Sequence, residues 1–251
     1  MAGTDSGRFE GRVAVVTGAS SGLGEAVTRQ LREGGAKVFG VGRDKARLES
    51  ALQDGDETAW LAADLTDPAA ATEVVEACVD RFGGLDILVN AAGAHTMRHT
   101  AEVTDADWQH DLAINLSAPF YLSRAALPHL LDRSGCIVNV SSIAGLEGQA
   151  YSAAYCAAKH GLIGLTRAMA LEFDSKGIRI NCVCPGGMTT PMVQNFTFPE
   201  DPDYTLIMKI AAARGLMDPA QVANVITFLC SPEASAVHGA IYTVDNGKMS
   251  L

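Results

Sequence analysis

Short, nearly uninterrupted apolar runs recur along the chain, and this rhythm restricts the fold more than any other feature. Most of the runs are separated by stretches long enough to form a helical crossover. The runs occupy Val13–Thr17, Val38–Val41, Trp60–Ala63, Ile87–Asn90, Cys136–Ser141, Arg179–Val183 and Ile241–Val244. Strands that are buried on both faces are continuously apolar, so their alternation with helices predicts an α/β fold with a parallel sheet between two helical layers.

The chain is expected to form one domain. No linker-like change of composition divides its 251 residues, of which 48% are hydrophobic and 19% charged, as is usual for a folded globular protein. We therefore predict a single domain over residues 1–251, with a core from about 10 to 247. The segment Met192–Leu216, which contains FTFPEDPDY, breaks the rhythm and is expected to form an excursion above the sheet.

Charge and cysteine content exclude several classes of partner. The formal net charge is −10, and no basic run offsets it, which argues against nucleic acid or an anionic membrane as the main partner. The first residues lack an apolar segment of signal-peptide length, and no apolar stretch reaches membrane-spanning length, so a cytoplasmic protein is predicted. The six cysteines show no CxxC pair or metal-ligand spacing, so reduced thiols and no metal site are expected.

A glycine-rich turn, TGASSGLG at 17–24, lies directly between the first apolar run and a helical stretch. Gly18 permits a tight turn, Gly22 permits close approach of a ligand, and Gly24 permits the helix to pack on the strand. The free N–H groups at the start of that helix suit a phosphate. The spacing departs from GxGxxG, so the turn favours a nucleotide site without establishing one.

Tyr155 and Lys159 are four residues apart in a helical stretch, and Ser142 ends a strand thirteen residues before the tyrosine. Positions i and i+4 share a helix face, so the ammonium group can lie near the phenol and favour its ionised form. Such a tyrosine can transfer protons as a general acid and base. Taken alone, the pair also fits a core tyrosine followed by an exposed lysine.

Together, these motifs resemble the classical short-chain dehydrogenase/reductase family. The matching pieces, in the family's order over about residues 10 to 247, are TGASSGLG at 17–24, NAAG at 90–93, Asn115, Ser142, YCAAK at 155–159 and PGGMTTPM at 185–192. The resemblance implies a single Rossmann-type, doubly wound domain with a seven-stranded parallel sheet. It also implies reversible hydride transfer between a nicotinamide cofactor and an alcohol/carbonyl pair.

The resemblance implies catalytic roles for four residues. Tyr155 would exchange a proton with the substrate oxygen, and Ser142 would donate a hydrogen bond to that oxygen. Lys159 would lower the pKa of the tyrosine and hold the ribose of the cofactor, while Asn115 would place a water that links the lysine to solvent. Ser141 is the adjacent competitor of Ser142, but its side chain is expected on the opposite side of the strand.

The same resemblance implies a set of cofactor contacts along the carboxyl ends of the strands. Asp64 would bind the adenine amino group, and the segment from Pro185 would bind the nicotinamide carboxamide. Ala91 replaces a second asparagine that relatives often carry there. The implied contacts are Gly18, Ser20, Ser21, Gly22, Leu23, Gly24, Arg43, Asp64, Leu65, Asn90, Ala91, Gly93, Tyr155, Lys159, Pro185, Gly186, Met188 and Thr190.

The choice between the two nicotinamide cofactors depends on the end of the second apolar run. Relatives that prefer NAD place an aspartate where Gly42 stands, and here Arg43 follows it. A guanidinium suits the 2′-phosphate of NADP, so NADP(H) is predicted, with NAD(H) as the alternative. Two features weigh against this choice: Asp44 could pair with Arg43, and the glycine turn lacks a second basic residue.

The substrate is predicted only as a class. Met192 and Phe196 in the excursion, with Leu146 and Gln149 after Ser142, are expected to line the pocket of a mainly hydrophobic small-molecule alcohol or ketone. A 3-oxoacyl-thioester reductase and a catalytically idle nucleotide-binding sensor or scaffold stay open as alternatives. Three histidines are interpreted as solvated loop or helix residues: His95, His99 and His110.

A stripe of small residues on the Tyr155 helix allows another helix to approach closely. The stripe consists of Ala157, Gly161, Gly164 and Ala168. In the resembled family this helix often packs against its symmetry mate, so a homotetramer or homodimer is predicted. A tight contact within the same chain explains the stripe nearly as well.

Overall fold

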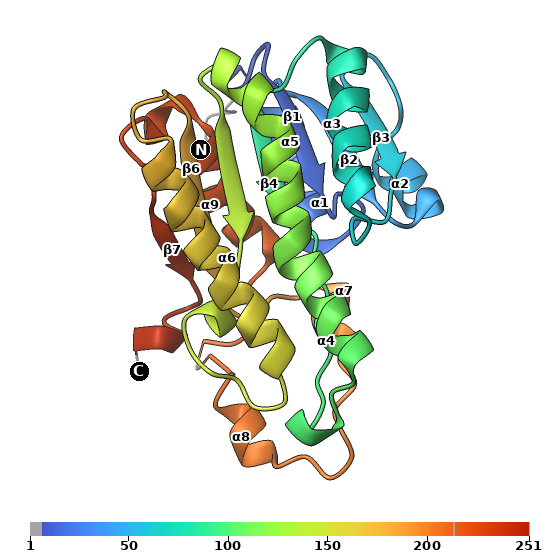
Figure 1. The fold of residues 1–251 in the computed structure, drawn as a ribbon, viewed down its shortest axis with the longest axis vertical. Coiled ribbons are helices and arrows are strands. Elements are labelled where there is room, and N and C mark those ends of the chain that lie inside the picture. The colour runs from blue at the N-terminus through green and yellow to red at the C-terminus, as the bar shows by residue number, and fades with distance from the viewer. Residues whose placement is uncertain (1–6, 213, 251) are drawn as a thin grey trace.

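The computed structural model describes residues 7–212 and 214–250, and they form a single α/β domain (Figure 1). Seven strands lie in one sheet in the order β3-β2-β1-β4-β5-β6-β7, and each pairs with its neighbours in parallel. The seven predicted strands are therefore confirmed, with ends that shift by up to two residues. Their bounds are β1 Val13–Thr17, β2 Lys37–Gly42, β3 Thr58–Ala62, β4 Ile87–Asn90, β5 Cys136–Val140, β6 Arg179–Pro185 and β7 Ile241–Val244.

Helices cover both faces of the sheet, as the apolar strands require (Figure 1). Helices α1, α2 and α9 pack on one face, and α3, α5 and α6 pack on the other. None of the helices within the described ranges is both long and apolar enough to cross a membrane. The helices are α1 Gly22–Glu33, α2 Lys45–Ala51, α3 Pro68–Phe82, α4 Asp105–Leu112, α5 Ala118–Asp132, α6 Ala153–Glu172, α7 Pro191–Gln194, α8 Tyr204–Met208 and α9 Pro219–Cys230.

Strand β1 shows why the runs have no polar alternation. Ala14 and Val16 pack into the core on the α1/α9 side, whereas Val13 and Val15 pack into the core on the α3/α5 side. All four side chains are at most 2% exposed. Because successive side chains of a strand point to opposite faces, covering both faces buries every position.

The order of the strands reverses between β1 and β4, so the crevice of the fold lies at the carboxyl ends of these two strands. The ends are joined by Thr17, whose Oγ1 accepts hydrogen bonds from the backbone N–H groups of Ala91 (3.0 Å) and Ala92 (2.9 Å). The excursion carries α7 and α8 and projects beyond this edge of the sheet (Figure 1). Residues of this segment line the cavity at the crevice.

Buried polar bonds attach α6 to the centre of the sheet. Asn90 donates to Asn139 (2.8 Å), which donates to Thr166 on the helix (2.9 Å). Ser141 Oγ donates to the backbone carbonyl of Lys159 (2.9 Å). A buried polar group that loses its hydrogen-bond partner destabilises the fold. These bonds therefore restrict both the rotation of the helix and its height above the strands.

At the opposite end of the sheet, the carboxylate of Asp86 is 4% exposed and accepts three hydrogen bonds. The donors are the backbone N–H of Val13 (2.9 Å), Arg12 (2.9 Å) and Arg133 (3.2 Å). The carboxylate thereby connects β1, the start of β4 and the end of α5. Removing it would leave a buried N–H unpaired and two guanidinium groups without their partner.

We expect Asp86→Ala to lower the free energy of unfolding by about 2–3 kcal/mol, less than for a fully buried pair because both arginines are partly exposed. Urea denaturation followed by circular dichroism measures this change. Glu49→Ala, which removes the exposed ion pair with Lys45, is the matched control and should change the free energy by less than about 0.5 kcal/mol. Equal effects of the two substitutions would contradict the anchoring role of Asp86.

Candidate active site

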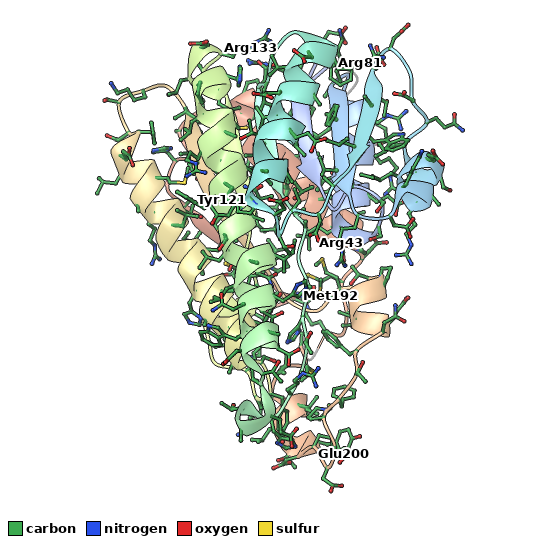
Figure 2. All side chains as sticks on the ribbon, turned by 45° about the vertical axis from the view of Figure 1, so that its right-hand side comes forward. Arg43, Arg81, Tyr121, Arg133, Met192 and Glu200 are labelled. Carbon is green, nitrogen blue, oxygen red and sulfur yellow. The ribbon has the colours of Figure 1, made fainter. Side chains whose placement is uncertain are left out.

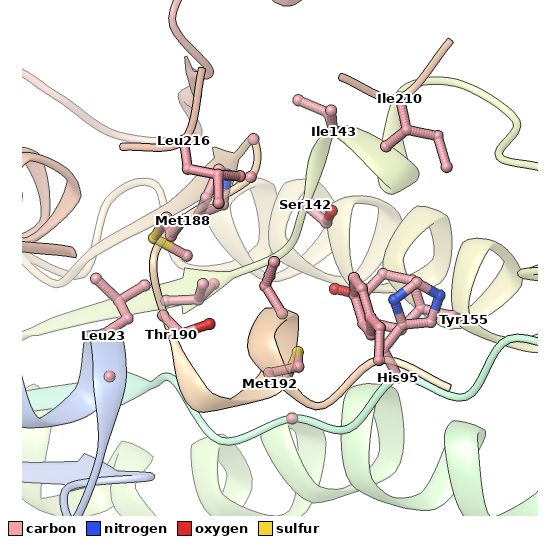
Figure 3. A pocket seen from close by; sticks show the side chains of 18 of the residues that line it. Leu23, His95, Ser142, Ile143, Tyr155, Met188, Thr190, Met192, Ile210 and Leu216 are labelled. Carbon is pink, nitrogen blue, oxygen red and sulfur yellow. The ribbon is translucent and has the colours of Figure 1, made fainter. Parts of the chain in front are cut away.

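A cavity of about 400 Å³ lies at the carboxyl ends of the central strands, between the glycine turn and the excursion (Figure 3). It brings together most of the residues that the sequence analysis selected. The predicted residues in its wall are Gly18, Ser21, Gly22, Leu23, Gly24, Ala91, Gly93, Ser142, Gln149, Tyr155, Lys159, Pro185, Gly186, Met188, Thr190, Met192 and Phe196. Those outside its wall are Ser20, Arg43, Asp64, Leu65, Asn90, Asn115 and Leu146.

The glycine turn forms a cradle that side chains would fill. Gly18 and Gly22 have positive φ angles of 71° and 56°, a backbone conformation that L side chains rarely adopt. A Cβ atom at Gly24 would collide with the carbonyl of Gly18. Ser21, the N-cap of α1, makes no side-chain capping bond, so the first N–H groups of the helix are left for a ligand. These residues fit the pyrophosphate of a dinucleotide.

Helix α6 and the end of β5 bring three functional groups together. Tyr155 and Lys159 lie on the inward face of α6, 8% and 3% exposed, with Lys159 Nζ 5.6 Å from the centre of the tyrosine ring. The Ser142 hydroxyl follows β5 and is close enough to Tyr155 to lower the pKa of the phenol in part. Its oxygen accepts from the N–H of Ala144 (3.1 Å), which leaves the hydroxyl proton for Tyr155 or a ligand. Ser141 points away, as expected, to the backbone of Lys159.

Burial sets the protonation states of this group. It raises the pKa of Tyr155 to about 12, and the hydrogen bond with Ser142 opposes the rise only in part. Burial also lowers the pKa of Lys159 to about 8. Lys159 donates to the carbonyl of Val140 (2.9 Å) rather than to the phenol. In the protein alone the expected lowering of the tyrosine pKa is therefore not found, and Tyr155 carries its proton at neutral pH.

Asn115 lies in the wall of the neighbouring loop rather than in the cavity itself. It belongs to a short π-helix, η2 (Ala113–Ser117), between α4 and α5, and it is fully buried. Its side-chain amide donates to the carbonyls of Ala94 (2.9 Å) and Asp111 (3.0 Å) and accepts from the N–H of Ala94 (3.3 Å). Asn115 thus joins the loop after β4 to the α4/η2 segment. It lies near Lys159, because a Cβ atom at Gly93 would be 2.8 Å from Asn115 Oδ1 and 3.7 Å from Lys159 Nζ.

Arg43 extends from the carboxyl end of β2, at the edge of the crevice (Figure 2). Asp44 caps α2 and pairs with Arg47 (3.3 Å), so it does not pair with Arg43. Within 7–212 and 214–250, Arg43 forms no hydrogen bond or ion pair, and its guanidinium is exposed. Ser20 lies close by, because a Cβ atom at Gly42 would be 3.3 Å from its Oγ. These two side chains therefore lie close together at the carboxyl end of β2.

The side chains of three other predicted cofactor contacts interact with the protein itself. Asp64 accepts from the backbone N–H (3.0 Å) and the hydroxyl (2.8 Å) of Thr66, and these bonds lower its pKa. The side chain of Leu65 is buried in the hydrophobic core. Asn90 is 2% exposed and bonds Asn139, so its side chain serves the sheet rather than the cavity.

His95 is a wall residue that the sequence analysis missed. It was interpreted as solvated, but the loop after β4 passes under the excursion and partly buries it. Its ring stacks on the ring of Tyr155, with centroids 4.1 Å apart and planes 17° apart, and it meets Phe196 edge-on at 5.0 Å (Figure 3). The sequence feature that could have indicated this position is its place two residues after Gly93, on a loop that follows a strand end at the cavity. The interpretation of His95 as solvated was wrong.

The outer part of the cavity is apolar and is covered by the excursion. Besides Met192 and Phe196, its apolar lining comes from Met97, Ile143, Phe198, Ile207, Ile210 and Leu216. Leu146, in contrast, lies outside the wall and is 36% exposed. Two bonds hold the excursion to the loops below it: His99 to the carbonyl of Glu200 (2.8 Å), and the N–H of Asp203 to the hydroxyl of Tyr151 (2.8 Å).

Known proteins resemble this chain over nearly its whole length. Residues 18–248 match the family model described as Enoyl-(Acyl carrier protein) reductase. The chain is 38% identical to the 3-oxoacyl-[acyl-carrier-protein] reductase FabG of Vibrio cholerae, over 97% of this chain and 99% of that one. It is 36% identical to the meso-2,3-butanediol dehydrogenase of Serratia marcescens, over 96% and 95%.

A solved structure shares the fold as well. The 3-ketoacyl-(acyl-carrier-protein) reductase of Brucella melitensis, complexed with NADH, superposes with a TM-score of 0.87 at 32% identity, over 96% of this chain and 99% of that one. The fold, the site and these matches show that the chain belongs to the short-chain dehydrogenase/reductase family. It is a nicotinamide-dependent oxidoreductase that acts on alcohol and carbonyl groups.

The burial of Lys159 generates a testable pH dependence. The pKa of this lysine is 10.5 in its unperturbed form and about 8 in the folded protein, so between these values the unfolded chain binds a proton that the folded protein does not. The free energy of unfolding contributed by Lys159 therefore rises with pH through this window. Relative to Lys159→Met, we expect the parent to gain about 3 kcal/mol between pH 8 and 10.5.

The measurement is chemical denaturation of both proteins at several pH values without cofactor. The difference between the two proteins removes the contribution of the other titrating groups, including Tyr155. A difference that stays constant from pH 8 to 10.5 would show that Lys159 is not desolvated as described.

Proposed function

We propose that this protein transfers a hydride reversibly between NADP(H) and the carbonyl or secondary alcohol of a mainly hydrophobic small molecule, with Tyr155 as the general acid and base. The observation that carries the proposal is the meeting of Tyr155, Ser142 and Lys159 at the floor of one cavity, directly beside the glycine turn. One ligand-sized space thus joins a dinucleotide cradle to proton-transfer groups.

In the reducing direction, the carbonyl oxygen of the substrate lies between the hydroxyls of Ser142 and Tyr155. Ser142 donates a hydrogen bond to the oxygen as negative charge develops on it, and Tyr155 gives up its proton. The nicotinamide, when bound, supplies the hydride. The ammonium of Lys159 stabilises the phenolate that Tyr155 becomes, because the two groups share a buried site.

The cofactor preference is argued from the end of β2. The guanidinium of Arg43 is exposed at the crevice, and within the described residues it forms no ion pair, because Asp44 is engaged by Arg47. Its charge acts on Asp64, whose pKa is lowered mainly by Thr66 and to a smaller degree by Arg43. No acid at position 42 opposes a phosphate. A charged guanidinium and the Ser20 hydroxyl favour the 2′-phosphate, which supports NADP(H) over NAD(H).

The nature of the cavity supports a free small molecule over a carrier-bound thioester. The outer wall is almost entirely apolar, and the tip of the excursion, marked by Glu200 in Figure 2, carries three neighbouring acids, Glu200, Asp201 and Asp203. The cations of the excursion, Lys209 and Arg214, come later in its sequence. These acids are exposed and would repel the phosphate of a pantetheine arm. The FabG relative keeps a 3-oxoacyl-thioester reductase as the second candidate.

Assembly is proposed as a homotetramer or homodimer in the cytoplasm. Helix α6 supplies the argument, since its small residues serve two different purposes. Gly161 lets Leu116 approach within the same chain, because a Cβ atom there would be 2.9 Å from Leu116 Cδ2. Gly164, in contrast, faces open space among the described residues, and Leu171 on the same helix is 81% exposed. This outer face suits a second copy of the chain.

The first test of the proposed function is turnover with a panel of ketones and 3-oxoacyl thioesters, with NADPH and NADH compared side by side. We expect NADPH-dependent reduction that Tyr155→Phe lowers by about 10²–10⁴-fold, the usual contribution of a general acid. Tyr242→Phe, which alters a tyrosine on β7 outside the cavity, is the control. Equal activity of Tyr155→Phe and the parent would refute the mechanism, and cofactor binding without any turnover would favour the idle sensor or scaffold.

The second test concerns the cofactor. We expect Arg43→Ala to raise the Kd for NADPH by about tenfold or more, as loss of a hydrogen bond to a charged group predicts, and to change the Kd for NADH less than about twofold. Fluorescence titration of the nucleotide measures both constants. Arg47→Ala removes a neighbouring arginine that is already paired with Asp44, so it should leave the NADPH/NADH ratio unchanged. Equal losses for both cofactors in Arg43→Ala would overturn the assignment.

A further inference from the structure

His95 lies beside the proton-transfer group without a role in the proposed chemistry. Its ring is stacked on Tyr155 in the cavity wall, where the other outer wall groups are mostly apolar (Figure 3). The edge contact with Phe196 holds the ring from the side of the excursion. A polar ring in this position can bind a polar group of the ligand through one of its nitrogens.

The hydrogen bonds around Ser152 determine which ring nitrogen carries the proton. Ser152 is 1% exposed and is the N-cap residue of α6, but its side chain makes no capping bond. Its only hydroxyl proton is donated to the carbonyl of Ala150 (3.2 Å). Its oxygen can then only accept from His95 Nε2, which lies 2.9 Å away. We therefore assign the ring proton to Nε2, which leaves Nδ1 with a lone pair.

The imidazole is neutral, so this arrangement persists at physiological pH. Burial, together with a smaller effect of the charge of Lys159, lowers the pKa of His95 to about 4. A neutral ring with Nε2–H has one acceptor, Nδ1, and no second donor. Within the described ranges, no protein group donates to Nδ1. The two nitrogens of an imidazole point away from each other, so Nδ1 does not face Ser152.

We infer that Nδ1 of His95 accepts a hydrogen bond from a hydroxyl of the substrate, one or two carbon atoms from the reacting carbonyl. The protein would therefore select hydroxy-ketones, and the corresponding diols in the oxidising direction, over plain ketones. The stacking sets this distance: the ring centroids are 4.1 Å apart, so groups bound to His95 and to Tyr155 are close neighbours on one ligand. This inference rests on the proposed function and names its substrate class.

The inference also distinguishes the two candidate functions. A 3-oxoacyl thioester carries a second carbonyl two carbons from its ketone, and that oxygen is an acceptor. It would face the lone pair of Nδ1 without a proton between them, which costs binding free energy. A hydroxyl at the same place satisfies the nitrogen. A site built to bind a hydroxyl rejects an analogue without one more strongly than an apolar pocket can.

The test compares ketones that differ only in the donor. The probes are 2-hydroxycyclohexanone and 3-hydroxycyclohexanone, each paired with its methyl ether, which keeps the oxygen but lacks the proton. We expect the parent to prefer at least one hydroxy-ketone over its ether by about tenfold in kcat/KM, as one neutral hydrogen bond of about 1.4 kcal/mol predicts. In His95→Phe, which retains an aromatic ring, the preference should fall to about twofold or less.

Two further variants distinguish loss of the hydrogen-bond acceptor at position 95 from a general structural effect of replacing a histidine. His95→Asn places an amide oxygen near the position of Nδ1 and should retain part of the preference that His95→Phe loses. His110→Phe changes an exposed histidine on α4 and should keep the preference of the parent. A parent without any preference for the hydroxy-ketones, or a His95→Phe variant that keeps it, would overturn the inference.

A binding measurement separates failure of the inference from failure of the proposed function. In Tyr155→Phe with NADP⁺, the Kd values of cyclohexane-1,2-diol, cyclohexane-1,3-diol and their mono-methyl ethers are measured by calorimetry, with and without His95→Phe. Tighter binding of a diol that depends on His95 supports the inference even when no probe is turned over, and the missing turnover then counts against the proposed function alone. Equal binding of diols and ethers refutes the inference whatever the turnover.

Discussion

The attachment of α6 to the sheet is the interaction on which the rest of the site depends. Ser141 and Asn139, at the end of β5, bond the backbone of Lys159 and the side chain of Thr166 on the helix. The ammonium of Lys159 bonds the carbonyl of Val140 on the same strand. These buried bonds place Tyr155 over the strand ends, within reach of Ser142. Without them, apolar packing alone would allow the helix to slide or rotate.

Desolvation then determines the chemistry of the cavity. It keeps the proton on Tyr155, weakens the hold of Lys159 on its own proton, and leaves His95 neutral. The excursion, which two hydrogen bonds hold to the loops below it, adds apolar side chains to the wall of the same cavity.

Much of the fold could be predicted from the sequence because its cause is local. Strands that are buried on both faces have continuously apolar sequences, so all seven strands could be predicted. The glycine turn could be predicted because its backbone adopts conformations that only glycine adopts easily. The i, i+4 spacing placed Tyr155 and Lys159 on one face of α6. What failed was the direction of the tyrosine pKa shift, because spacing shows a neighbouring charge but not the burial that outweighs it.

The sequence by itself determined the order of elements, the glycine turn and the shared helix face of Tyr155 and Lys159, since each follows from short-range pattern. Only the tertiary structure decided that His95 stacks on Tyr155, that Leu146 stays outside the cavity, and that Asp44 pairs with Arg47 rather than Arg43. These facts depend on how loops far apart in the chain pack against each other. A loop residue is solvated or buried according to what lies above it, and periodicity carries no information about that.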